Sequence, residues 1–68
     1  MKVQILPEYR QLDRYVIRVI VDGSFKEQSS AMTWTLRKEL DRLFEQYREQ
    51  GAEQIEVGEI PPANDLRD

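Results

Sequence analysis

Alternating apolar and polar positions near the start of the chain predict a short β-strand at 2–6. Within this segment Val3 and Ile5 alternate with polar residues, as expected for a strand with one buried face. Pro7 follows, and because proline cannot donate a hydrogen bond to a neighbouring strand, it either ends this strand or marks an edge of the sheet. The polar stretch 8–13 is predicted to form a loop.

The segment 14–21 is the strongest strand candidate, because most of its residues are β-branched or aromatic. The dipeptide Asp22-Gly23 comes next. It favours a type I′ turn, in which both central residues adopt a positive φ. The turn predicts a hairpin with a short third strand at 24–28, and a loop that leads directly into a helix is the alternative.

A regular hairpin also predicts which residues face each other across the turn. Phe25 would lie opposite Ile20, Lys26 opposite residue 19, and Glu27 opposite Arg18. The last pair joins opposite charges, which favours this register.

One long helix is predicted at Ser29–Gln50, where neither proline nor glycine interrupts the chain. Ser29 and Ser30 are suited to its N-terminus, because serine hydroxyls accept hydrogen bonds from the free amides of a first turn. Gly51 stands where a C-capping glycine belongs. The start of the helix stays open, because 31–36 also alternates and contains two threonines, as a strand would.

The end of the chain predicts one more strand, in which Ile55, Val57 and Ile60 are separated by polar residues and glycine. Pro61-Pro62 would stop this strand, and 61–68 is predicted to be a flexible tail. We expect the last strand to run parallel to 14–21, because a helix would connect them through a right-handed crossover.

These elements predict a single α+β domain over residues 1–60 with the order β-β-β-α-β, or β-β-α-β without the third strand. One amphipathic helix would pack on one face of a three- or four-stranded, mainly antiparallel sheet. Its apolar stripe would be about 120° wide, and the stripe contains Met32, Thr33, Leu36, Leu40, Leu43, Phe44 and Tyr47.

Trp34 lies outside this stripe, beside Arg37, Lys38 and Asp41 on the helical projection. An exposed tryptophan is typical of binding hot spots, so we predict a partner contact at the helix start. The alternatives are that the indole folds back over the sheet edge, or that it lies on Lys38 as a cation–π pair.

The segment 14–21 is apolar on both faces, and a single helix covers only one of them. Its odd-numbered residues, from Tyr15 to Val21, are expected to meet the helix. The other face would be a modest apolar patch that Leu6 extends, and such patches often mark association surfaces. The alternative is that the tail covers this patch through Leu66 or Pro61-Pro62. The predicted patch consists of Val16, Arg18, Ile20 and Phe25.

Composition excludes several kinds of chemistry. The 68 residues include neither Cys nor His, which removes disulfides, thiolate zinc sites and the usual nucleophile–base pairs. No glycine-rich phosphate loop occurs, and the acidic residues lack the spacing of a calcium loop. We therefore expect no enzymatic activity, no metal and no cofactor. No apolar run is long enough to span a membrane and no secretory signal precedes the first strand, so we expect a soluble, cytoplasmic protein.

The formal net charge of −3 disfavours DNA or RNA as a partner, because nucleic-acid affinity depends on Lys and Arg. The alternative function is nevertheless nucleic-acid binding through a basic hairpin that contains Arg10, Arg14, Arg18 and Lys26, with Tyr9 and Tyr15 nearby. The order of strand, Asp-Gly turn and helix loosely resembles the small DNA-binding arm domains of integrases, which implies reading of a groove by the sheet. No diagnostic residue extends this resemblance beyond the element order.

The sequence thus predicts a small non-enzymatic protein-binding or regulatory module, of a size common among accessory proteins of bacteria and phages. Its partner would be another protein or a second copy of itself, as a homodimer. The two predicted surfaces are the uncovered sheet face and the helix start.

Overall fold

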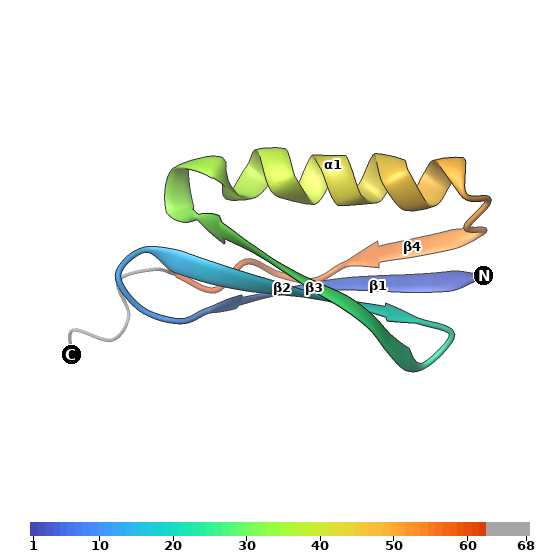
Figure 1. Ribbon diagram of the computed structural model, residues 1–68, viewed down its shortest axis with the longest axis horizontal. Helices are drawn as coiled ribbons and strands as arrows, with labels where there is room; N and C mark the ends of the chain where they lie inside the picture. Colours follow the sequence, from blue (N-terminus) through green and yellow to red (C-terminus); the bar gives the residue numbers. More distant parts are fainter. Residues whose placement is uncertain (63–68) are drawn as a thin grey trace.

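The computed structural model describes residues 1–62 and shows a helix lying along one face of a four-stranded sheet (Figure 1). The strand order is β3-β2-β1-β4, in which β1 pairs antiparallel with β2 and parallel with β4. The predicted α+β class and the order β-β-β-α-β are confirmed. The elements are β1 (Lys2–Tyr9), β2 (Arg14–Val21), β3 (Ser24–Met32), a 3-10 turn (Thr33–Thr35), α1 (Leu36–Glu49) and β4 (Gln54–Val57).

Strand β1 continues through Pro7 to Tyr9, so the predicted loop at 8–13 is too long. The proline is tolerated because its nitrogen faces the side of β1 where β4 has already ended. The carbonyl of Ile5 accepts a hydrogen bond from Gly58 on that side, and backbone groups two residues apart point the same way. The edge interpretation of Pro7 is therefore correct. At the end of the strand, Tyr9 packs edge-to-face on Tyr15, with ring centroids 5.3 Å apart.

The β2–β3 hairpin has the predicted turn, because Asp22 and Gly23 adopt φ values of 50° and 85°. The predicted register is wrong beyond Phe25. A register shift leaves Lys26 unpaired, so that Glu27 lies opposite Val19 and not opposite Arg18. A one-residue bulge moves every later side chain of the strand to the other face. Glu27 therefore faces the helix, and the predicted charge pair with Arg18 does not form.

The helix begins at Leu36, which corrects the predicted start at Ser29. Ser29 and Ser30 do not cap the helix but lie within β3, opposite Ile17 and Val16. Hydrogen bonds of two threonines favour the extended and 3-10 conformation before Leu36. The Thr33 amide donates to the carbonyl of Asp13 at 2.8 Å, and the Thr35 hydroxyl accepts from the Met32 amide at 3.0 Å.

The helix ends as predicted, with Gly51 at a φ of +92°. Its amide donates to Arg48 and that of Ala52 to Tyr47, which is the hydrogen-bond pattern of a Schellman motif.

Strand β4 lies beside β1 and runs parallel to it, so the predicted parallel alignment with β2 is wrong. Because β1 and β3 already occupy both sides of β2, a strand that follows the helix can join only an edge of the sheet. Ile60 lies beyond β4, which ends at Val57. Of the predicted tail, residues 63–68, which include Leu66, lie outside the described residues.

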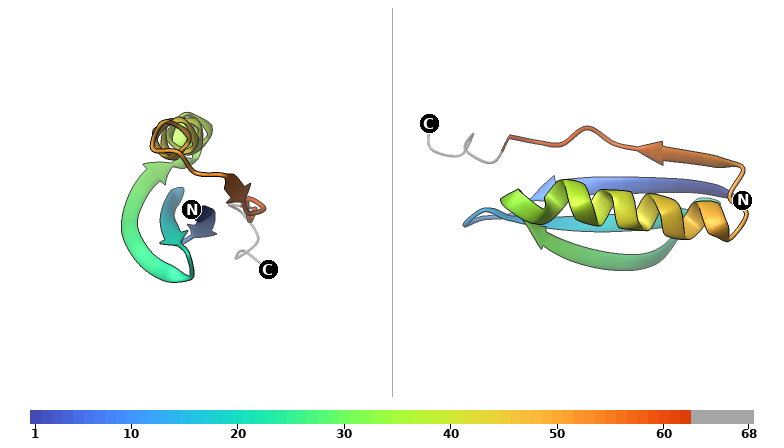
Figure 2. Two further views of the ribbon diagram at one scale, coloured as in Figure 1. Left: turned by 90° about the vertical axis from the view of Figure 1, so that its right-hand side faces the viewer. Right: turned by 90° about the horizontal axis from the view of Figure 1, so that it is seen from above.

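The core lies between the sheet and α1, and Figure 2 shows β3 curving away from β2 towards the helix. Residues 15, 17 and 19 of β2 face this core, as predicted, and Val21 packs at its margin. Met32 and Thr33 do not belong to the helix stripe, because they precede the helix. The buried apolar residues are Val3, Ile5, Tyr15, Ile17, Val19, Leu36, Leu40, Leu43 and Tyr47.

Candidate functional site

The face of the sheet opposite α1 carries an exposed apolar patch, which we call the open face. Successive side chains of a strand alternate between faces, so the burial of Tyr15, Ile17 and Val19 against α1 directs their even-numbered neighbours to the other side. The open face is defined by Leu6, Val16, Arg18, Ile20 and Phe25.

Phe25 is the most exposed apolar member of the open face, at 61% exposure. It lies opposite Ile20, which is half-buried, and Leu6 is 38% exposed on the next strand. Pro61 does not cover this patch, because its carbonyl accepts a hydrogen bond from the Tyr15 hydroxyl at 2.5 Å on the α1 side. The structure therefore places the four sheet residues predicted from the sequence on one exposed surface.

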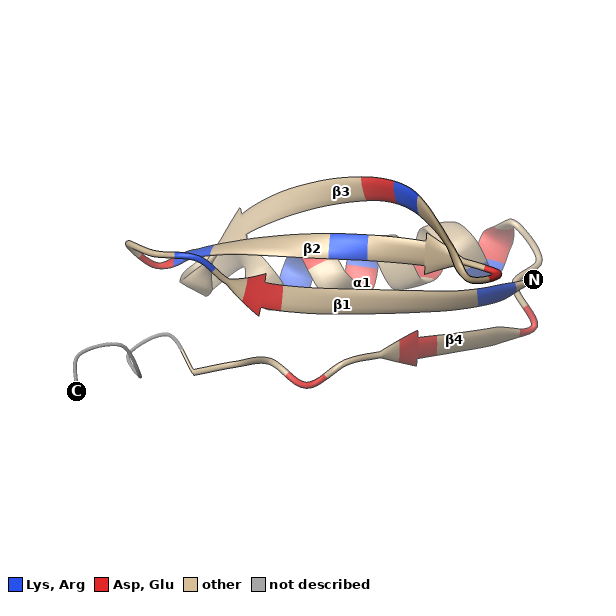
Figure 3. Ribbon diagram, turned by 90° about the horizontal axis from the view of Figure 1, so that it is seen from below, with Lys and Arg blue, Asp and Glu red and all other residues tan. Residues whose placement is uncertain are grey.

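Basic residues, interspersed with acidic ones, lie on the strands and hairpins that form the open face (Figure 3). Arg18 lies 3.9 Å from the Glu8 carboxylate, which also contacts Arg10 at 2.9 Å. Within residues 1–62, Arg14 forms no ion pair. Lys26, in the bulge beside Phe25, likewise has none among the described residues. The chain as a whole carries −3. Glu8 and Glu56 also lie on this face, where Arg10, Arg14, Arg18 and Lys26 outnumber them.

A concavity of about 380 Å³ opens at the β1–β2 hairpin end of this surface. Its cationic walls are Arg10 and Arg14, and Val16 joins it to the open face. The hairpin exposes Leu12, which is 83% exposed and adopts a positive φ of 54°. The sequence did not predict this concavity, because nothing in the polar stretch 8–13 indicated two consecutive residues with positive φ.

Two aromatic residues of the proposed basic hairpin do not belong to the open face. Tyr9 and Tyr15 pack against each other, and the Tyr15 side chain is buried on the α1 side. Among the described residues, Phe25 is therefore the aromatic side chain that the open face offers to a partner.

The residues of the second predicted surface, at the helix start, lie in different surroundings in the structure. Trp34 lies in the 3-10 turn and is 72% exposed, so it does not fold back over the sheet edge. Within the described chain it makes no cation–π contact with Lys38, which is exposed elsewhere on the helix.

Arg37 and Asp41 line a groove of about 310 Å³ between α1 and the segment that follows β4. Sequence reasoning missed this groove because it assigned Ile60 to the last strand. The break in alternation between Val57 and Ile60 was the available signal. The groove is completed by Leu40, Phe44, Val57, Gly58 and Ile60.

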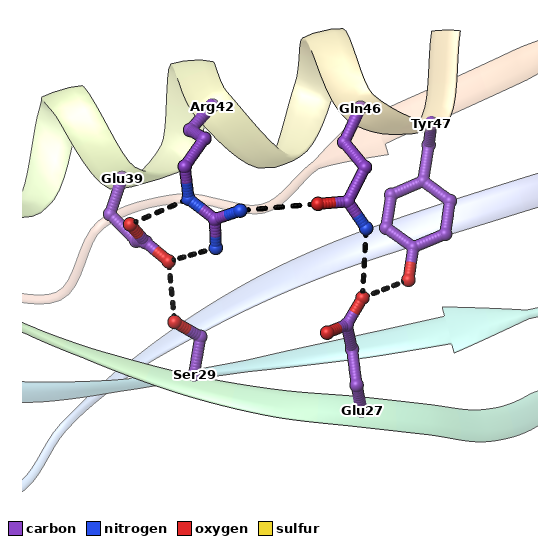
Figure 4. Close-up of polar contacts among 6 residues, drawn as sticks. All are labelled: Glu27, Ser29, Glu39, Arg42, Gln46 and Tyr47. Carbon is purple, nitrogen blue, oxygen red and sulfur yellow. Dashed lines mark hydrogen bonds and ion pairs between the residues drawn. The ribbon is translucent and has the colours of Figure 1, made fainter. Parts of the chain in front are cut away.

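A polar network joins β3 to α1 (Figure 4). The Glu27 carboxylate accepts hydrogen bonds from the Tyr47 hydroxyl and from the Gln46 amide, the second at 3.3 Å. Burial, and then the hydrogen bond with Glu27, raise the pKa of Tyr47 to about 12.

A second part of this network centres on Glu39. Its carboxylate accepts hydrogen bonds from Arg42 at 2.6 Å and from the Ser29 hydroxyl at 2.5 Å. The Arg42 hydrogen bond is the main cause that lowers the pKa of Glu39. Both carboxylates thus accept hydrogen bonds, and the bonds between β3 and α1 hold the strand against the helix.

Within residues 1–62 no cluster of three or more carboxylates could hold a metal ion, and the helix there is too short and polar to cross a membrane. Comparison with known proteins gave no match to a protein-family model, to a curated protein or to a solved structure.

Proposed function

We propose that this protein is a small non-enzymatic binding module that holds a partner protein on the open face of its sheet. The observation that carries the proposal is the exposure of Phe25 at 61%, opposite Ile20, with Leu6 diagonal to Ile20 on the next strand. An antiparallel sheet usually presents a polar surface to water, and a contiguous exposed apolar patch is typical of an interaction site. The helix covers the other face, so residues 1–62 supply no second layer for this patch.

A photo-crosslinking experiment tests the proposal in cells that produce the protein. Phe25 is replaced by p-benzoylphenylalanine, and illumination is expected to form a covalent adduct with a specific protein. The same replacement at Glu45, on the exposed side of α1, is the matched control and should give no such adduct. Equal adducts from both positions, or none from position 25, would contradict the proposal.

Substitutions distinguish the two predicted surfaces. Phe25→Asp is expected to abolish capture of the crosslinked partner while the far-ultraviolet circular dichroism stays unchanged, because an exposed side chain contributes little to the core. Trp34→Ala removes the exposed aromatic residue of the helix start. If capture survives Phe25→Asp but is lost in Trp34→Ala, the helix start and its groove are the binding surface instead.

Nucleic-acid binding through Arg10, Arg14, Arg18 and Lys26 has weaker support. Arg10 and Arg18 share the Glu8 carboxylate, which reduces the positive charge available to phosphates. This alternative predicts oligonucleotide affinity that falls steeply with salt and is lost when Arg14 and Lys26 are both changed to Glu.

A further inference from the structure

We infer, on the basis of the proposed function, that the open face binds an acidic amphipathic segment, in which carboxylates border apolar side chains. The apolar part of such a segment would cover Ile20 and Phe25. Its carboxylates would lie against the cations that border the open face.

The cations that border the open face differ in whether they form ion pairs. Arg14 and Lys26 have no carboxylate partner within residues 1–62, whereas Arg10 and Arg18 share Glu8. Unpaired cations at the rim of an apolar patch favour a partner of opposite charge, because complementary potentials speed encounter and exclude wrong partners.

The concavity at the β1–β2 hairpin adjoins the open face. Val16 belongs both to the open face and to the concavity lined by Arg10 and Arg14. Ile20 lies four residues further along β2, which corresponds to about 13 Å at roughly 3.3 Å per residue. An occupant can therefore place an apolar side chain on Ile20 and Phe25 while a carboxylate enters the concavity between the two arginines.

The charge of the open face disfavours a second copy of the chain as the occupant. In a two-fold symmetric dimer each open face would meet an identical one. Arg14 and Lys26, which have no ion-pair partner within residues 1–62, would then meet the same excess of positive charge on the other copy, which disfavours the contact. A neutral or basic peptide lacks the complementary charge for the same reason.

Selection from a displayed library of random peptides of about 16 residues tests the inference, since this length spans the distance in either a helix or a strand. The wild-type protein is the bait, and Phe25→Asp is used for counter-selection. Enriched peptides are expected to be acidic, with Asp or Glu on both sides of apolar residues. Their affinity should fall at least about tenfold for the double variant Arg14→Glu, Lys26→Glu.

The outcomes separate this inference from the proposed function. Enrichment of neutral or basic peptides that need Phe25 but not Arg14 and Lys26 would overturn the inference and leave the proposed function standing. Failure to enrich any peptide that depends on Phe25 would overturn both.

Two further measurements use the same proteins. If sedimentation equilibrium shows a dimer that Phe25→Asp dissociates, the occupant of the open face is a second copy of the chain and not an acidic segment. If the protein binds a fluorescent oligothymidine and the double variant abolishes this binding, the occupant of the open face is nucleic acid and not an acidic segment. Thermal unfolding of each variant confirms that the fold survives the substitutions.

Discussion

Tyr47 connects the core of the molecule to the polar network that holds β3. Its ring is 1% exposed, and its hydroxyl donates to the Glu27 carboxylate of the edge strand. A buried phenol with such an acceptor stabilises the fold only while it keeps its proton, because the phenolate would be buried beside a second negative charge.

The protein is expected to lose stability between about pH 10 and about pH 12. The unfolded chain ionises this phenol near its ordinary pKa of about 10, whereas the folded pKa of Tyr47 is about 12. The stabilisation is complete below the lower value and is lost as the pH rises through the higher one, by roughly 2 to 3 kcal/mol. Urea unfolding across this pH range measures the effect.

Tyr47→Phe is the matched variant for this prediction. It should cost about 1 kcal/mol at neutral pH, because one hydrogen bond is lost. It should also make the alkaline loss of stability smaller than in the wild type. An identical alkaline loss in both proteins would show that Tyr47 does not cause it.

At the scale of elements, the sequence predicted those parts of the fold that local chemistry specifies. Arg14–Val21 is rich in β-branched residues, Asp22-Gly23 suits only a few turns, and Gly51 supplies the positive φ of a helix cap. The boundary between β3 and α1 was wrong because 26–30 is polar on both faces. In such a segment neither a register nor a helical period is strongly specified.

The bulge at Lys26 predicts an uneven response to deletions in β3. Removing Lys26 is expected to leave Phe25 opposite Ile20 and Glu27 opposite Val19, because the bulge is the one place where β3 holds an extra residue. The contact between Glu27 and Tyr47 should persist. Ultraviolet titration should therefore still place the pKa of Tyr47 near 12.

Deletion of Gln28 is the control, because the strand can then pair regularly only if Lys26 takes the place opposite Val19. Glu27 would move to the open face beside Arg18, and Tyr47 would lose its acceptor. We expect this deletion to lower the pKa of Tyr47 and to destabilise the protein more than removal of Lys26 does. Equal effects of the two deletions would contradict the bulged register.

At the scale of the whole molecule, the two-layer architecture explains why the open face could be predicted and the groove could not. The alternation of β2 alone places Val16, Ile20 and Phe25 away from the helix, once the turn is known. The groove depends on the path of the chain after Val57, where Gly58 bonds to Ile5 and turns Ile60 towards α1. Local patterns do not specify contacts between segments that are distant in the sequence.

Strand β3 is expected to be less stable than β1 and β2. None of its residues is buried, whereas β1 and β2 supply most of the sheet's share of the core. Native-state hydrogen exchange should give β3 amides paired with β2 an opening free energy at least about 1 kcal/mol below that of amides between β1 and β2.

The variant Tyr47→Phe should lower the opening free energy of β3 by about the 1 kcal/mol that it costs the whole fold, because both openings break the hydrogen bond between β3 and α1. A single opening free energy for all strands would instead indicate that the sheet opens as one unit.

The pairing of β4 with β1 also has a consequence for biosynthesis. The ribosome produces β1 before its partner Gln54–Val57, which emerges only after the helix has been completed. Until then the nascent hairpin exposes the backbone of one β1 edge, including the Ile5 carbonyl that Gly58 later occupies. An unpaired edge of this kind can recruit strands from neighbouring polypeptides. Translation that stalls before Gln54 is therefore expected to yield aggregation-prone fragments, which chaperones or proteases would have to remove.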